Sequence, residues 1–189
     1  EDNLMDIRVP GNTPSYELYG DETTIQTIWT KLDVHSAPIG AFGWHLIEIL
    51  AGIPHIIHET SEQFVPQMLN YQAIGGLSFS KGCYPGQEIV ARMHYLGKLK
   101  KRMFLAKVRS DEAPLPFQEL YSAKKETGSK TGNIVNVAKH PDGEFVILAV
   151  IQISDAGSTE IRLGDASGPP LNLMELPYTV ELKEEKGDQ

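Results

Sequence analysis

The residues with the clearest chemical potential form one short run, residues 81–88, with the sequence KGCYPGQE. The run contains Cys83, the chain's single cysteine, and a lysine two positions before it. Pro85 suits the first turn of a helix, where its missing N–H is not needed. A helix N-terminus and the charge of Lys81 both stabilise a thiolate. The run therefore predicts a reactive thiol at Cys83.

The stretch after this run, residues 87–95, has the pattern of an amphipathic helix. Its apolar positions share one stripe: Ile89, Val90 and Met93. Glu88 precedes Arg92 by four positions, a spacing at which a carboxylate and a guanidinium pair across one helical turn. Cys83 would therefore lie in the segment that leads into this helix.

The role of Cys83 depends on what surrounds it. A lone cysteine can also be a buried, unreactive thiol that fills space. A nucleophilic thiol needs an adjacent base, and His94, about two turns into the expected helix, is poorly placed to serve as one. A single cysteine cannot hold an iron–sulfur cluster, which takes about four ligands. We therefore assign Cys83 as the catalytic residue, acting as a ligand or redox group, with any cluster shared with a partner protein.

A second group of chemically versatile residues is His55, His58 and Glu59. Their order differs from the H-E-x-x-H zinc motif, and they follow Pro54, which favours a loop. On a helix the two histidines would share a face, but after a helix stop they need not. We expect structural or surface histidines here and no metal site.

Around the cysteine the sequence closely resembles a known signature. Residues 81–88 match the K-G-C-Y-x-G-Q-E motif of the YgfZ family of folate-binding proteins, which are relatives of the glycine-cleavage T-protein, an aminomethyltransferase. The segments 63–67, 75–79 and 176–178 are similar to that family as well, and the resemblance is densest over residues 51–104. It implies a folate-binding protein whose cofactor is tetrahydrofolate.

The resemblance also implies which side chains meet the folate. In T-protein relatives a carboxylate in this stretch hydrogen-bonds the pterin ring, whereas this chain, like YgfZ-type sequences, carries Gln67. An amide offers one donor and one acceptor group, and its bond is weaker than that of a carboxylate. The alternative for Gln67 is an ordinary surface position. The residues expected to bind the cofactor are Gln67, Lys81, Glu88, Arg92, Lys98 and Lys100.

Residues 98–102, with the sequence KLKKR, are the one dense basic run of an acidic chain. Such a run can be a solvated hinge between domains. It can also bind anions, and the glutamate tails of folates are anions that lysines would hold through salt-screened attraction. RNA is a third and weaker alternative.

The order of the expected elements predicts an α+β fold. The resemblance implies that residues 1–97 are a T-protein-like folate-binding core whose N-terminal part is missing. Within residues 98–182, β-rich runs alternate with turn signals, a pattern typical of an antiparallel β-barrel or sandwich. We expect these runs at 102–108, 132–138, 144–153 and 159–163. Residues 183–189 are expected to form a charged tail.

Nearer the N-terminus, residues 16–19 alternate like a strand, and Asp21 can cap a helix that follows it. The apolar stripe of that helix would comprise Ile25, Ile28, Trp29 and Leu32. Residues 42–50 are strongly apolar and fit either a helix or a strand. Gly52 and Pro54 resemble a helix stop.

Composition limits the classes of partner. The net charge of −8 disfavours a general nucleic-acid binder, which needs a basic face, although the basic run leaves tRNA binding open. No apolar run approaches the roughly 20 residues of a membrane helix, so we expect no membrane partner. A lone cysteine excludes an internal disulfide and fits a reducing compartment. We expect a cytoplasmic protein.

The function implied by the resemblance is folate-dependent support of iron–sulfur cluster assembly or repair and, through cluster enzymes, of tRNA modification. This is an auxiliary role, and its expected partners are folate and iron–sulfur proteins or cluster assembly factors. The alternative is a folate-dependent one-carbon transferase of the aminomethyl type. Such an enzyme needs a general acid/base carboxylate near the folate nitrogens.

Overall fold

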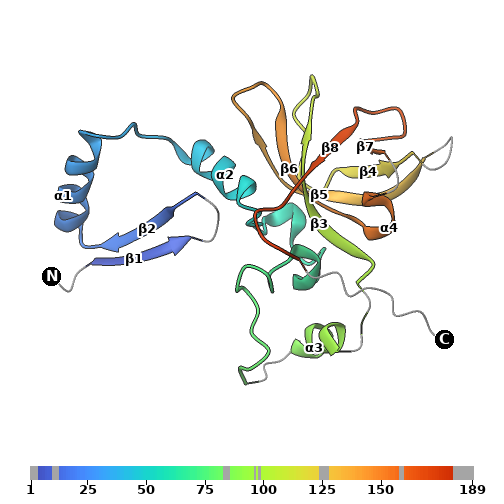
Figure 1. Ribbon diagram of the computed structural model, residues 1–189, viewed down its shortest axis with the longest axis horizontal. Helices are drawn as coiled ribbons and strands as arrows, with labels where there is room; N and C mark the ends of the chain where they lie inside the picture. The colour runs from blue at the N-terminus through green and yellow to red at the C-terminus, as the bar shows by residue number, and fades with distance from the viewer. Residues whose placement is uncertain are drawn as a thin grey trace.

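A single six-stranded antiparallel sheet forms the centre of the protein, flanked by helices (Figure 1). The computed structural model describes residues 4–9, 13–82, 86–95, 97, 99–123, 128–157 and 160–180, and only the backbone of His94. The strands of this sheet are adjacent in the order β7-β4-β5-β6-β3-β8. They are β3 (Lys101–Val108), β4 (Glu119–Ser122), β5 (Ser129–Lys139), β6 (Phe145–Gln152), β7 (Ile161–Leu163) and β8 (Leu171–Met174).

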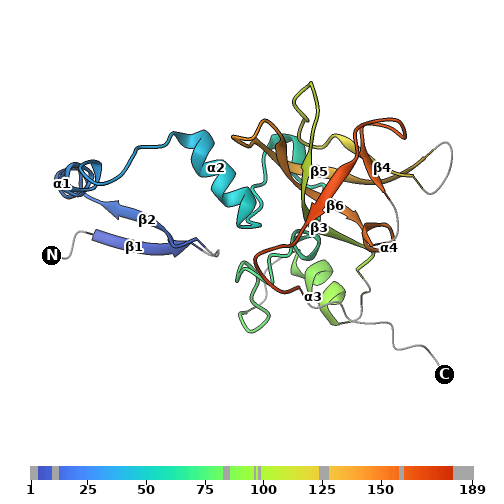
Figure 2. The ribbon, with the colours of Figure 1, turned by 45° about the horizontal axis from the view of Figure 1, so that its top comes forward.

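The sheet curls until its two edge strands approach each other, as Figures 1 and 2 show. Arg162 in β7 forms a single antiparallel bridge with Pro170, the residue before β8. The amide of Leu163 donates to the carbonyl oxygen of Pro169 at 3.0 Å. The predicted α+β class is confirmed in its coarse form, a mixed fold with a curled antiparallel sheet that is compatible with a barrel.

Strand β6 shows why the sheet needs a cover on both faces. Seven of its eight residues are buried, which matches its unbroken apolar sequence. Phe145, Ile147, Ala149 and Ile151 belong to one hydrophobic cluster, and the residues between them belong to another. Because successive side chains of a strand point to opposite faces, the two clusters lie on opposite sides of the sheet.

The first cluster, here called the inner cluster, draws on all six strands and fills the space that the curl encloses. The second, the outer cluster, combines strands β3, β5 and β6 with two elements from the first half of the chain. These elements are helix α2 (Ala41–Leu50) and the short 3₁₀ helix η2 (Pro66–Leu69). Ile49 and Leu69 are their fully buried contributions. Residues 41–71 therefore pack against the outer face of the sheet.

Among the other helices, three are short: η1 (His58–Thr60), α3 (Gln87–Tyr95) and α4 (Ile153–Ala156). Over the residues that the structure describes, no helix has both the length and the hydrophobicity needed to cross a bilayer.

The N-terminal residues form a hairpin and a helix that extend away from the sheet (Figure 1). Strands β1 (Leu4–Val9) and β2 (Ser15–Gly20) pair with each other, and α1 (Glu22–Asp33) follows. The predicted cap is confirmed, because the Asp21 side chain accepts from the amide of Thr24 at 3.0 Å. No residue of α1 is buried, and Trp29 is 59% exposed. The expected apolar stripe therefore contributes nothing to either cluster.

The sequence analysis located four of the six strands of the sheet. The predicted strands at 102–108 and 132–138 are confirmed within β3 and β5, and the runs at 144–153 and 159–163 contain β6 and β7. The ambiguous apolar segment is the helix α2. Strands β4 and β8, of four residues each, were not predicted because they show too little alternation to detect. The expected charged tail lies outside the described residues.

Gly52 ends α2 and fixes how the chain turns towards the sheet. Its φ of +70° is a left-handed conformation that residues with a Cβ avoid. A Cβ built there would lie 2.7 Å from Tyr178 Cε1 and 2.9 Å from Leu176 Cδ2. The predicted helix stop is thus confirmed, and both its conformation and its surroundings require glycine.

Gly52→Ala should lower the free energy of unfolding by about 2–4 kcal/mol, because backbone strain and overpacking add. The matched control is Gly75→Ala, where φ is +77° but no atom lies within 4 Å of the added Cβ. That variant should lose only the strain, about 1–2 kcal/mol. Urea denaturation monitored by tryptophan fluorescence gives both values. Equal losses would contradict the close packing against Tyr178.

Candidate functional site

The residues expected to form the site differ in exposure. Cys83 and Lys98 lie outside the described residues. Gln67 is buried, and the remaining four have exposed side chains: Lys81, Glu88, Arg92 and Lys100. Gln67 is therefore the expected site residue whose surroundings the structure defines best.

Helix α3 has the bounds expected from the sequence, and Figures 1 and 2 place it at the edge of the molecule below the sheet. Val90 and Met93 are half-buried, as the stripe predicts. Ile89 is 63% exposed, so its assignment to one stripe with the half-buried Val90 and Met93 was wrong. The expected pairing of Glu88 with Arg92 was also wrong, since no salt bridge joins these two described residues.

Gln67 connects η2 to α3. Its side chain is 6% exposed, so the alternative of a surface position is wrong. Its amide Nε2 donates to the main-chain carbonyl oxygen of Val90, 23 residues along the chain, at 2.6 Å. Its Oε1 is buried and has no hydrogen-bond partner among the described residues. One amide hydrogen of Gln67 is thus used within the protein, and its acceptor oxygen is enclosed and unpaired among the described residues.

Asn70 fixes the other end of η2. It caps the 3₁₀ helix in a left-handed conformation, with φ of +60°, which asparagine tolerates better than most residues. Its side chain is fully buried, and Nδ2 donates to the carbonyl oxygen of Met103 in β3 at 3.0 Å. Its Oδ1, like the oxygen of Gln67, is buried without a partner in the described part of the chain. The segment 67–70 therefore carries two unused buried acceptors.

Two tyrosines fix the segment that follows α2. The Tyr178 hydroxyl donates to the carbonyl oxygen of Gly52 at 2.8 Å, and the Tyr71 hydroxyl donates to that of Pro54 at 3.2 Å. Burial raises the pKa of both phenols, so both remain donors at neutral pH. The sequence analysis placed Tyr178 in a family-like segment but gave it no role, and no local pattern identified Tyr71.

The predicted structural histidine at position 55 is part of a polar group beside α2. Its Nε2 lies 3.0 Å from Oε1 of Glu48, and Nδ1 of His45 lies 3.9 Å from Oε2 of the same carboxylate. Asn136 holds the main chain of His55 with two hydrogen bonds of 2.9 Å each, one to the amide and one to the carbonyl. Within the described residues, no group of three metal-ligating side chains could hold an ion.

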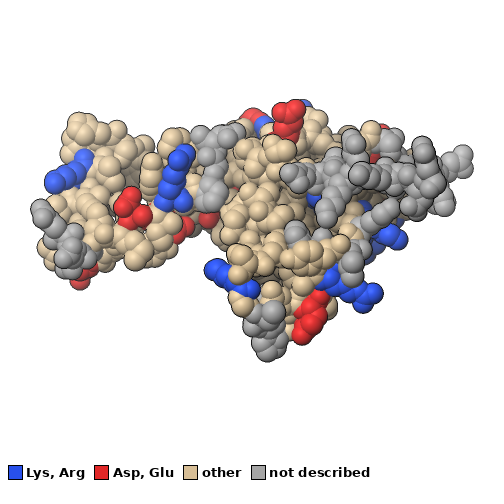
Figure 3. All heavy atoms as spheres, turned by 60° about the horizontal axis from the view of Figure 1, so that its bottom comes forward, with Lys and Arg blue, Asp and Glu red and all other residues tan. Residues whose placement is uncertain are grey.

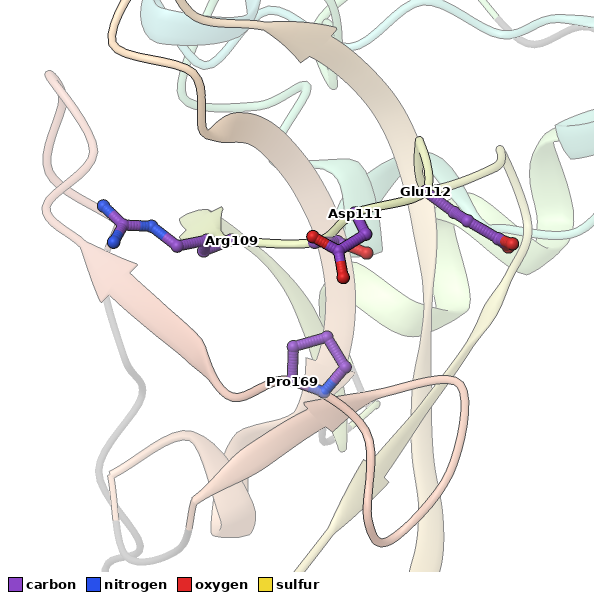
Figure 4. A pocket seen from close by; sticks show the side chains of 5 residues that line it. Arg109, Asp111, Glu112 and Pro169 are labelled. Carbon is purple, nitrogen blue, oxygen red and sulfur yellow. The ribbon is translucent and has the colours of Figure 1, made fainter.

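Two hollows lie away from α3. One has a volume of about 460 Å³ and is lined by Arg109, Ser110, Asp111, Glu112 and Pro169. Figure 4 shows the guanidinium of Arg109 pointing away from the two carboxylates, so the lining does not converge on one ligand charge. It lies at the end of β3 remote from Lys101. A second hollow of about 130 Å³ includes Trp44, Glu48 and Pro177.

The basic run is divided between surface and interior. Lys100 is exposed and Lys101 is half-buried, but Arg102 is 8% exposed. Arg102 is paired with Ile151 of the inner cluster, and cross-strand partners share a face. Burial lowers the pKa of its guanidinium. Arg102 is therefore no part of an exposed anion-binding cluster, and Figure 3 shows basic and acidic side chains interspersed rather than one basic field.

The comparisons with known proteins connect this architecture to a family. No family model matches the chain. The chain is 37% identical over 177 residues to the tRNA-modifying protein YgfZ of Colwellia psychrerythraea, and the alignment covers 92% of this chain and 53% of that protein. The chain thus spans about half the length of the curated relative that it matches. Over most of its own length the chain is therefore similar to a member of the YgfZ family.

Proposed function

We propose that this chain is part of a folate-binding auxiliary protein that supports iron–sulfur cluster assembly or repair and, through cluster enzymes, tRNA modification. The observation that carries the proposal is the 37% identity to a protein named for tRNA modification. The signature at residues 81–88 adds the resemblance to folate-binding relatives. The first half of the chain would then be a T-protein-like folate-binding core, and the curled sheet would be the barrel of that family.

Two side chains support the proposal, Gln67 and Lys100. Gln67 Oε1 is a buried acceptor without a partner among the described residues, and a buried acceptor left unpaired costs about 1–3 kcal/mol. A pterin ring presents N–H donors along its edge, so one of them would satisfy this oxygen. The exposed ammonium of Lys100 would pair with a glutamate tail. Bound tetrahydrofolate would supply one-carbon units carried on its ring nitrogens.

Tetrahydrofolate should bind the family-length protein that contains this chain. A ligand at about a hundred times its Kd stabilises the native state by about 2.7 kcal/mol, which calorimetry detects as a higher melting temperature. Gln67→Met should reduce that shift, because the thioether is a much weaker acceptor than the amide oxygen. A wild-type melting curve unchanged by saturating tetrahydrofolate would remove folate from the proposal.

The lysines of the basic run should act through charge. Replacing Lys98, Lys100 and Lys101 with glutamine should weaken the binding of polyglutamylated folate more than that of the monoglutamate, because only the longer tail reaches several charges. Lys139→Gln, at an exposed position on β5, is the matched control. Affinities measured at two salt concentrations test the claim. Equal losses for both ligands would exclude a role in tail binding.

Cys83→Ser should leave the melting temperature nearly unchanged while the activity of dependent iron–sulfur enzymes collapses. A functional thiol at a partly open position loses its reactivity and little packing, because the hydroxyl is close to it in size. A buried, space-filling thiol would give the reverse order, since an unpaired buried hydroxyl costs about 1–3 kcal/mol. Complementation of a strain lacking the protein, together with calorimetry, separates the two roles.

A further inference from the structure

We propose that Gln67 is the positioning residue of helix α3, the helix that follows the cysteine signature, and that it acts by holding the main-chain carbonyl of Val90. This assignment differs from the role in pterin recognition that the family resemblance implies. The positioning role belongs to the Nε2 group of the amide, which faces the protein. Gln67 would hold α3 with or without bound folate, but the effect of this contact on function would require folate.

Among the described helices and strands, η2 is the element that α3 contacts most. Gln67 bonds the two elements directly, through the 2.6 Å contact between its Nε2 and the Val90 carbonyl oxygen. Val90 is half-buried, whereas Ile89 is 63% exposed. The hydrogen bond from Gln67 thus joins α3 to the element that it contacts most.

Gln67 can position α3 because η2 is itself held firmly. Asn70 bonds the carbonyl of Met103 in β3 at 3.0 Å, and Leu69 is 1% exposed within the outer cluster. Only two residues separate Gln67 from Asn70. Two hydrogen bonds therefore connect strand β3 to α3 through η2: Asn70 bonds Met103, and Gln67 bonds Val90.

The chemistry requires a donor at position 67. A main-chain carbonyl accepts hydrogen bonds only, and an ionised carboxylate also only accepts. A carboxylate at position 67 would place two acceptors against each other in a buried setting, whereas an amide donates. The glutamine of this chain is therefore explained by α3 as well as by a ligand.

The two ends of the Gln67 amide face different partners. Nε2 holds α3, and the buried Oε1 has no partner among the described residues. A ligand N–H that reaches Oε1 would share one rigid side chain with the helix. On the proposed function, folate binding and the placement of helix α3 are coupled through this amide.

The test compares Gln67→Glu and Gln67→Met with Gln63→Glu. Gln63 is exposed, and its side-chain amide donates to the nearby carbonyl oxygen of Ser61 at 3.2 Å. Gln63→Glu therefore makes the same amide-to-carboxyl change at a position that does not bond α3. Hydrogen exchange without ligand measures the protection of the α3 amides. At pH 8 both changes at position 67 should lower that protection about fivefold to tenfold, the effect of one lost hydrogen bond. Thiol alkylation, specific for Cys83, should accelerate in parallel.

The pH profile separates a lost donor from general damage. A buried carboxyl has its pKa raised, so at pH 5 the group introduced by Gln67→Glu should be protonated and donate to Val90 again. Its α3 protection should then return towards the wild-type value at that pH, while that of Gln67→Met should stay low. Gln63→Glu should remain within twofold of wild type at both pH values.

Three results would overturn the proposal. The first is unchanged α3 protection in both variants at position 67. The second is an equal loss of amide protection in strands β5 and β6, which would mean that Gln67 stabilises the whole fold and not α3 in particular. The third is no recovery of Gln67→Glu at pH 5. Because these measurements use no ligand, a failure of tetrahydrofolate to bind would refute the proposed function and leave this result unaffected.

Discussion

The constraint on which the rest of the structure depends is that the central sheet is apolar on both faces. The inner face is covered by the sheet's own curl, but the outer faces of β3, β5 and β6 need other residues to exclude water. Helix α2 and η2 meet that need through Ile49 and Leu69, each at most 1% exposed. Burying such side chains contributes about 1.5–3 kcal/mol each. The position of the candidate site follows from this cover, because η2 carries Gln67.

Covering the outer face brings main-chain groups out of water, and side chains replace the lost hydrogen bonds. Asn136, Tyr178 and Asn70 each bond a main-chain carbonyl of another segment. Such pairing is expected, because an unpaired buried polar group is costly. The side-chain oxygens of Gln67, Asn70 and Gln72 depart from it within the described residues. Segment 67–72 is therefore where the pairing of buried polar groups is incomplete.

The sequence predicted those helices and strands whose formation depends mainly on residues close together in the chain. Helix α3 was located by the amphipathic pattern of residues 87–95, and β6 by its unbroken apolar run. Contacts between distant residues were out of reach: no local pattern indicates that Gln67 bonds Val90, and Arg102 looked like part of an exposed cluster until its pairing with Ile151 placed it inside. The sequence also misjudged Ile89, because a stripe on a short helix does not specify which side meets a neighbour.

The identity of residue 67 also bears on what kind of protein this is. A carboxylate can take or give a proton near neutral pH when its environment shifts its pKa, whereas an amide does not ionise. On the proposed function, the Gln67 amide would orient a pterin but could not move a proton. Its amide is in addition bonded to Val90, which suits a structural connection between ligand and helix. Both properties favour a binding and positioning role over one-carbon transfer at this residue.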